Sequence, residues 1–179
     1  MNVLVVVDMQ NDFIDGALGT SEAVAIVPKV AKKMRTFQGR VICTRDTHET
    51  TYLDTQEGRK LPVEHCIRGT AGWQLAPDIE AERKELPVDK PTFGSAALGQ
   101  LLKAQDNDLR AKGERIEKIT LVGLCTDICV ISNALLLKAF LPETEIAVDA
   151  ACCAGVTPER HKTALEAMRA CQITVDNET

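Results

Sequence analysis

The sequence predicts an α/β fold: a three-layer sandwich in which a mostly parallel sheet of about five or six strands has helices on both faces. Two observations favour it. Short apolar, β-branched runs recur along the chain, and longer segments with apolar residues at helical spacing separate them. A chain of 179 residues is also of ordinary length for one domain with a substantial hydrophobic core, so we expect a single domain over residues 1–179.

The expected strands are almost continuously apolar, which is typical of parallel strands covered on both faces. They are residues 3–7, 41–43, 119–122 and 146–148, with 86–88 as a weaker candidate and 173–175 as a short last edge strand. The expected helices are residues 21–37, 97–112 and 127–140, with a last helix opening at Thr157-Pro158-Glu159. Residues 46–81 are polar and lack periodicity, and so long an irregular stretch in a compact domain is usually functional.

Composition narrows the range of partners. The net charge is -5 without a block of like charges, which argues against nucleic acid, because phosphate binding needs a clustered basic face. No segment approaches the roughly 20 apolar residues that cross a bilayer, and no basic region precedes residues 3–7. We therefore expect a cytoplasmic protein with seven reduced cysteines and no membrane partner. A small-molecule substrate and assembly as a homo-oligomer are further expectations.

Polar side chains follow four of the expected strands. Ligands bind outside the carboxyl ends of the strands in open parallel sheets, so the residues at those ends should meet. Asp8 follows the first strand, and Thr44 to Asp46 follow the second. Asp89 and Lys90 follow the third, and the segment 123–129 follows the fourth. A carboxylate, an ammonium and a thiol at one edge suggest a site for nucleophilic catalysis.

Cys129 is the preferred nucleophile. It lies about one turn inside a helix whose expected cap is Thr126 or Asp127, where the helix dipole and a nearby lysine would lower the pKa of the thiol. Free backbone N–H groups at such a helix start could receive an oxyanion. The alternative is an inert buried thiol. Cys125 competes as nucleophile, although its place in a loop makes its backbone the more useful part.

Asp8 and Lys90 each have an alternative interpretation. Asp8 could cap the turn that follows the first strand, but a carboxylate beside a thiol can instead take its proton and later activate water. Lys90 could be a surface lysine, but at a strand end before Pro91 it is well placed to project into the cleft.

The irregular segment contains two of the three histidines. Asp46-Thr-His48 places two ligand side chains on the same side of an extended segment, and Glu57 and His65 follow. Carboxylate and imidazole together suit zinc, manganese or iron. Solvated loop histidines are the alternative. The third histidine, His161, is interpreted as structural or solvated.

Three ordered motifs carry a family resemblance that covers nearly the whole chain. They are VVVDMQNDF at residues 5–13, KPTFGS at 90–95 and GLCTDICV at 123–130. With these motifs the chain resembles the isochorismatase-like cysteine hydrolases, and most closely the nicotinamidases.

The resemblance implies a catalytic triad of Asp8, Lys90 and Cys129. It also implies a cis peptide between Leu124 and Cys125, with the backbone N–H groups of Cys125 and Cys129 as the oxyanion hole. It further implies a metal site formed by Asp46, His48, His65 and Glu57, with Asp54 as the competitor for the fourth ligand. Phe13 corresponds to an aromatic residue that packs on the substrate ring in this family, and its alternative interpretation is core packing. Zinc is the expected metal.

The expected reaction is hydrolysis of nicotinamide to nicotinate and ammonia through a thioester, as a step of NAD salvage. The segment before His65 reads LPVEH at residues 61–65 instead of the Pro-Pro-His common in nicotinamidases, which affects the substrate assignment more than the fold. The alternatives are a cysteine amidase for another carboxamide, carbamoyl or ureido substrate, a non-catalytic binding protein on the same fold, and a structural metal site in the loop.

Overall fold

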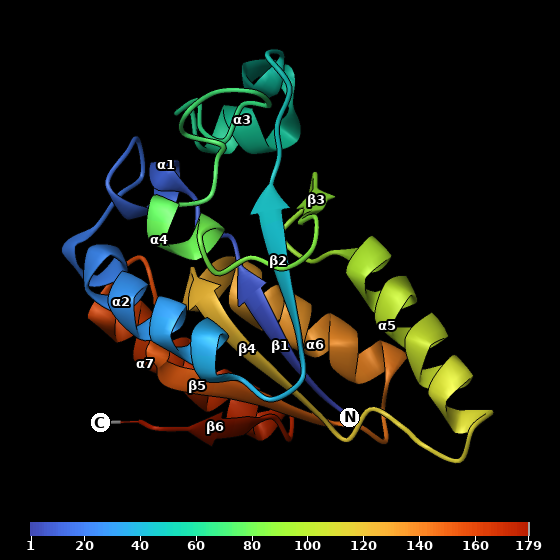
Figure 1. The fold of residues 1–179 in the computed structure, drawn as a ribbon. Coiled ribbons are helices and arrows are strands. Elements are labelled where there is room, and N and C mark those ends of the chain that lie inside the picture. The colour runs from blue at the N-terminus through green and yellow to red at the C-terminus, as the bar shows by residue number, and fades with distance from the viewer. Residues whose placement is uncertain (179) are drawn as a thin grey trace.

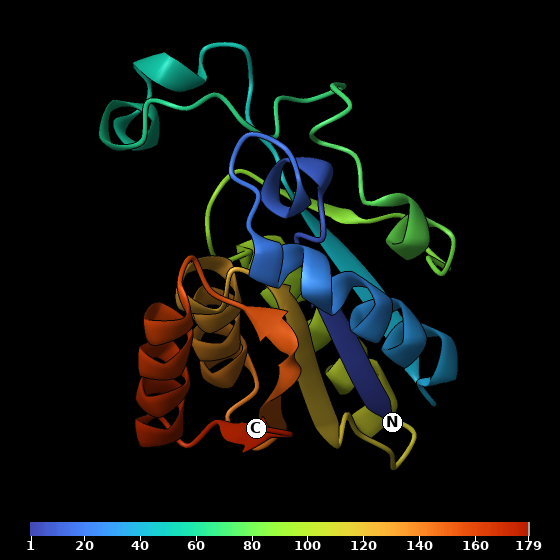
Figure 2. The same cartoon turned by 90° about the vertical axis from the view of Figure 1, so that its left-hand side faces the viewer.

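Six strands form one sheet in the computed structural model, which describes residues 1–178. Their order is β3-β2-β1-β4-β5-β6, and every neighbouring pair is parallel. The strands are β1 (Asn2–Val7), β2 (Arg40–Asp46), β3 (Val88–Lys90), β4 (Lys118–Leu124), β5 (Glu145–Ala154) and β6 (Thr174–Asp176). Helices lie on both sides of this sheet (Figure 1, Figure 2), so the predicted fold class is confirmed.

Two layers of helices cover the sheet (Figure 2). The side chains of β1 alternate between two hydrophobic clusters. Leu4 and Val6 pack on the side of α2 (Ser21–Thr36), and Val3, Val5 and Val7 pack on the side of α5 (Ala96–Arg110), α6 (Ile131–Phe140) and α7 (Pro158–Ala170). No helix within residues 1–178 is both long and apolar enough to cross a membrane. The helices are α1 (Asn11–Ile14), α2 (Ser21–Thr36), α3 (Gln56–Lys60), α4 (Pro77–Glu80), α5 (Ala96–Arg110), α6 (Ile131–Phe140) and α7 (Pro158–Ala170).

Side-chain caps explain where the long helices begin. The hydroxyl oxygens of Thr20, Ser95 and Thr157 accept backbone N–H bonds in the first turns of α2, α5 and α7. Such caps satisfy donors that have no partner inside the helix. The predicted starts of these three helices agree with the structure to within one residue.

Several predicted boundaries differ from the structure. β5 continues to Ala154, well beyond the predicted 146–148, and β2 continues to Asp46, beyond the predicted 41–43. β3 begins at Val88, because Leu86 is 83% exposed and Pro87 has no N–H for the ladder. The irregular segment 46–81 contains α3, α4 and the short 3-10 turn η1 (Tyr52–Asp54). The helix predicted over 127–140 begins instead as η2 (Thr126–Val130), a turn of π-helix that leads into α6.

The sheet has its switch point between β1 and β4. The strand order extends from β1 through β2 to β3 on one side and from β4 to β6 on the other, which opens a crevice at their carboxyl ends. A Cβ on Gly123 would lie 2.2 Å from the carbonyl oxygen of Val7, so only glycine allows the two strand ends to approach so closely. The segment after Gly123 is thereby held beside Asp8, the residue that follows β1.

Candidate active site

Three buried side chains meet at this crevice. Lys90, the last residue of β3, places its Nζ 2.6 Å from Asp8 Oδ2 and 3.4 Å from Cys129 Sγ. Asp8 is fully buried, and Lys90 and Cys129 are 1% and 4% exposed. The hydroxyl of Thr44 donates to Asp8 Oδ1 at 2.6 Å, which fixes the orientation of the carboxylate. The structure thus brings together the three residues in which the sequence predicts a triad.

The electrostatics of the thiol differ from the sequence-based expectation. Burial and the negative charge of Asp8 raise the pKa of Cys129 well above its ordinary value, although Lys90 acts in the opposite direction. Burial also raises the pKa of Asp8 against the attraction of Lys90. Burial opposes the charge on Lys90, but Asp8, Cys129 and Asp46 outweigh it and raise the pKa of the lysine. The expectation of a lowered thiol pKa is therefore wrong, because burial beside Asp8 outweighs the effect of Lys90.

The backbone around Cys125 has the unusual geometry that the motif implies. The peptide between Leu124 and Cys125 is cis. The carbonyl oxygen of Cys125 accepts the N–H groups of Ile128 and Val130 at 3.0 and 3.1 Å, which begins η2. Cys125 occupies the capping position, and neither Thr126 nor Asp127 caps the helix as predicted. Cys129 is the fourth of the five residues of this turn.

Asn133 is a residue of the site that sequence reasoning missed. Its Nδ2 donates to the carbonyl oxygens of Cys129 at 2.8 Å and Phe93 at 3.0 Å, and its Oδ1 accepts the N–H of Ser95 at 2.9 Å. Asn133 therefore links the segment that contains Cys129 to the loop that follows Lys90. The available signal was an amide in an otherwise mostly apolar helix, since buried polar side chains need partners.

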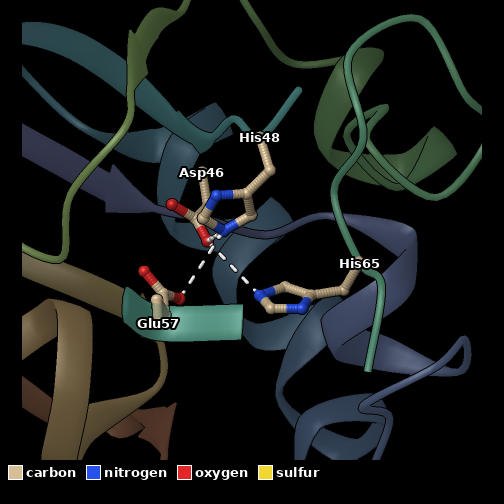
Figure 3. Close-up of side chains that lie close together, drawn as sticks. All are labelled: Asp46, His48, Glu57 and His65. Atoms are coloured by element: carbon tan, nitrogen blue, oxygen red, sulfur yellow. Dashed lines mark hydrogen bonds and ion pairs between the residues drawn. The ribbon is translucent and has the colours of Figure 1, made fainter. Parts of the chain in front are cut away.

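Four potential metal ligands converge above the crevice. One ligand atom from each of Asp46, His48, Glu57 and His65 lies within 4.8 Å of the others, and the side chains point toward one another (Figure 3). His48 Nε2 lies 3.0 Å from Asp46 Oδ2 and 3.6 Å from Glu57 Oε1, and His65 Nε2 lies 3.7 Å from Asp46 Oδ2. Among the described residues this cluster contains Glu57, which α3 carries inward, and does not contain Asp54, which is exposed.

The donor set fits a transition-metal ion. His65 Nδ1 lies 2.8 Å from the carbonyl oxygen of Val63, which holds the ring and leaves Nε2 for the cluster. Burial opposes protonation of His48, but the hydrogen bond and charge of Asp46 and the charge of Glu57 raise its pKa. Two imidazoles and two carboxylates form a combination that suits zinc, manganese or iron.

Gln10 is a second residue that sequence reasoning missed. Its fully buried amide accepts the N–H of Asp46 at 2.7 Å and donates to the carbonyl oxygens of Asp46 and Trp73 at 2.8 and 2.9 Å. The turn after Asp8 therefore holds the backbone of one potential ligand.

A cavity of about 280 Å³ is lined by one residue of each group, Lys90 and His48. Tyr52 and Arg68 are also among its lining residues. The ring of Phe13, which is 9% exposed, lies with its centroid 5.5 Å from that of His65 and also packs into the core beneath α2. Phe13 is therefore both a core residue and a neighbour of the cluster.

Known proteins resemble this chain over nearly its whole length. The isochorismatase domain model matches residues 2–178. The nicotinamidase/pyrazinamidase of Mycobacterium tuberculosis is 26% identical, with 97% of each chain covered. Among solved structures, the pyrazinamidase of Pyrococcus horikoshii in complex with zinc is 28% identical, with a TM-score of 0.76 and 97% of each chain covered. The N-carbamoylsarcosine amidase of Thermoplasma acidophilum is 29% identical, with a TM-score of 0.74 over 99% of this chain and 98% of that one.

The matched model spans nearly the whole chain, and the predicted family is confirmed. The sheet order, the three buried side chains at its switch point and this match lead to one conclusion: the chain belongs to the isochorismatase family.

Proposed function

We propose that this hydrolase converts nicotinamide to nicotinate and ammonia, with Cys129 as the nucleophile. The observation that carries the proposal is the contact of Lys90 with both Asp8 and Cys129, beside a group of four potential metal ligands. The relatives named nicotinamidase or pyrazinamidase support the choice of substrate.

The proposed reaction begins with transfer of a proton from Cys129 to Asp8. The raised pKa of the thiol makes this base necessary, and the charge of Lys90 stabilises the thiolate that forms. The sulfur then attacks the carboxamide carbon, and the backbone N–H groups of Cys125 and Cys129 stabilise the oxyanion. Asp8 returns its proton to the departing nitrogen, and ammonia leaves a thioester on Cys129. Asp8 next takes a proton from water, and the resulting hydroxide attacks the thioester and breaks its C–S bond. Asp8 returns this proton to the sulfur of Cys129, and the carboxylic acid loses its proton to solvent and leaves as nicotinate.

Asp46, His48, Glu57 and His65 would hold a divalent ion, which we propose is zinc, with manganese or iron as alternatives. When bound, the ion supplies a Lewis acid for the pyridine nitrogen of the substrate, and thus a fixed position for the amide. We further propose that Phe13 packs on the substrate ring, that the enzyme is a cytoplasmic homo-oligomer, and that it acts in NAD salvage.

A second candidate is the same chemistry on a carbamoyl or ureido substrate. The likeness to an N-carbamoylsarcosine amidase and the departure from Pro-Pro-His before His65 favour it.

Ammonia release measured over a panel of amides, with and without a chelator, tests these assignments. We expect nicotinamide to be the best substrate and its turnover to fall when the metal is removed. Preference for a carbamoyl compound would favour the second candidate. A protein that releases no ammonia from any of these compounds would leave the non-catalytic binding protein as the better interpretation.

A further inference from the structure

The start of α7 is bonded to the segment that carries the nucleophile. His161, in the first turns of α7, lies with its Nδ1 2.7 Å from the hydroxyl oxygen of Thr126, and a hydrogen bond joins the two atoms. Thr126 is fully buried and opens η2, between Cys125 and Cys129. The sequence predicts a structural or solvated histidine here, and in the structure its ring contacts the segment on which the proposed oxyanion hole depends.

A second hydrogen bond holds the next residue of η2, Asp127. Asp127 Oδ1 accepts the backbone N–H of Val156 at 3.0 Å, in the turn between β5 and α7. This turn packs closely against α7 and η2, because a Cβ on Gly155 would lie 2.8 Å from the backbone nitrogen of His161 and 3.0 Å from Asp127 Oδ1. Two consecutive residues of η2 are thus tied to the same turn, on the side of the sheet where α6 and α7 lie together (Figure 2).

The local structure of η2 explains why these two hydrogen bonds matter. Cys125 stands at the capping position and provides no side-chain cap, so no capping side chain fixes the first N–H groups of the turn. The Thr126 hydroxyl, which could have capped a helix, bonds to His161 instead. Burial lowers the pKa of His161 against the opposing charges of Glu178 and Asp127, which favours the neutral ring near neutral pH.

We propose that His161 is a positioning residue: through Thr126 it holds residues 125–130 so that the N–H groups of Cys125 and Cys129 face the developing oxyanion. The inference rests on the proposed cysteine hydrolysis. Donors that are held in place before the reaction stabilise the transition state more than the bound substrate. Loss of the hydrogen bond between His161 and Thr126 should therefore lower kcat and leave KM nearly unchanged.

Kinetics of four variants test the proposal. We expect His161→Ala and Thr126→Val each to lower kcat about tenfold, which is less than the roughly 10²- to 10³-fold loss from removing an oxyanion donor outright. KM should stay within about twofold. The double variant should lose no more than either single variant, because the same bond is already absent. His161→Asn, whose amide can reach the position of Nδ1, should recover most of the activity. Lys162→Ala, at the exposed neighbouring position, is the matched control.

Amide hydrogen exchange gives a readout that does not depend on turnover. In His161→Ala, the amides of residues 125–130 should exchange about tenfold faster, while those of β1 stay as protected as in the wild type. Unchanged kcat and unchanged exchange would overturn the proposal. A double variant whose loss of kcat equals the product of the two single-variant losses would also overturn it. Faster exchange over the whole chain, with an unchanged kcat of the folded fraction, would overturn it as well. If the wild type hydrolyses no amide, the proposed function fails, and the exchange at residues 125–130 still decides whether His161 holds the segment.

Discussion

Asp46 is shared between Lys90 and the cluster of potential metal ligands. Its Oδ1 lies 3.4 Å from Lys90 Nζ, and its Oδ2 lies 3.0 Å from His48 Nε2. One buried carboxylate thus contacts the cation of the proposed triad with one oxygen and the imidazole with the other. The proposed triad and the cluster of potential metal ligands, which the sequence predicts separately, are therefore one continuous polar network in the folded protein.

The first prediction separates the two cysteines of the nucleophile segment. Cys129→Ala should abolish amide hydrolysis, because it removes the thiol that contacts Lys90. Cys125→Ala should retain substantial activity, since the contribution expected from Cys125 is its backbone N–H. Steady-state ammonia release from both variants is the measurement. The reverse result, an active Cys129→Ala and an inactive Cys125→Ala, would refute the triad assignment.

The second prediction concerns the buried charge of Lys90. Lys90→Met should inactivate the enzyme and, at neutral pH, lower the free energy of unfolding by about 3–5 kcal/mol, because Asp8 and Asp46 lose their buried cation. Denaturant titration of wild type and variant measures the difference.

This deficit should depend on pH. Burial raises the pKa of Asp8, and loss of Lys90 removes the attraction that opposes that rise. In the Lys90→Met variant, Asp8 therefore binds a proton in the folded protein at a pH where it is ionised in the unfolded chain. The loss of unfolding free energy that the unpaired charge causes is complete above the pKa of Asp8 in the folded protein, and it shrinks as pH falls through that pKa. A deficit that is constant between neutral pH and pH about 5 would show that the unpaired Asp8 charge is not its cause.

The third prediction addresses the task of the metal. If the ion positions the pyridine nitrogen, His48→Ala should lose bound metal, raise KM for nicotinamide steeply and lower kcat, because a misplaced amide forfeits the orientation needed for attack. Cys129 should still react with a small alkylating agent. Metal content, steady-state kinetics and alkylation by mass spectrometry are the measurements.

Benzamide, which lacks the ring nitrogen, is the control for the His48 variant. It should be a poor substrate of the wild type and should lose far less than nicotinamide does in His48→Ala. Equal losses for the two compounds would instead indicate an ion that activates water or acts as a structural clamp.

The fourth prediction tests Asn133. Asn133→Leu should lower the free energy of unfolding by roughly 2–4 kcal/mol, because it leaves the carbonyl oxygens of Cys129 and Phe93 and the N–H of Ser95 without their partner. Urea denaturation measures the change, with Leu135→Ala at a half-exposed position of the same helix as the comparison. A loss no larger than that of Leu135→Ala would mean that water replaces the amide.

The sequence alone determined the layers of the fold and the residues gathered at its carboxyl edge. Continuous apolar runs specify buried parallel strands, and residues that follow such strands meet at one edge whatever the details of packing. Asp8, Lys90 and Cys129, and the ligand types of Asp46, His48 and His65, could therefore be named from order and spacing, with the family resemblance adding the triad and the cis peptide.

Other properties of the site depend on contacts between distant segments, which become visible in the folded chain. Glu57 rather than Asp54 faces the cluster because α3 turns one side chain inward and η1 leaves the other exposed. The direction of the thiol pKa depends on complete burial beside Asp8, which outweighs the lysine and could not be seen in the local pattern. The hydrogen bonds of Gln10 to Asp46, of Asn133 to Ser95 and of His161 to Thr126 span 36, 38 and 35 residues of the chain, and short-range periodicity contains no information about such pairs.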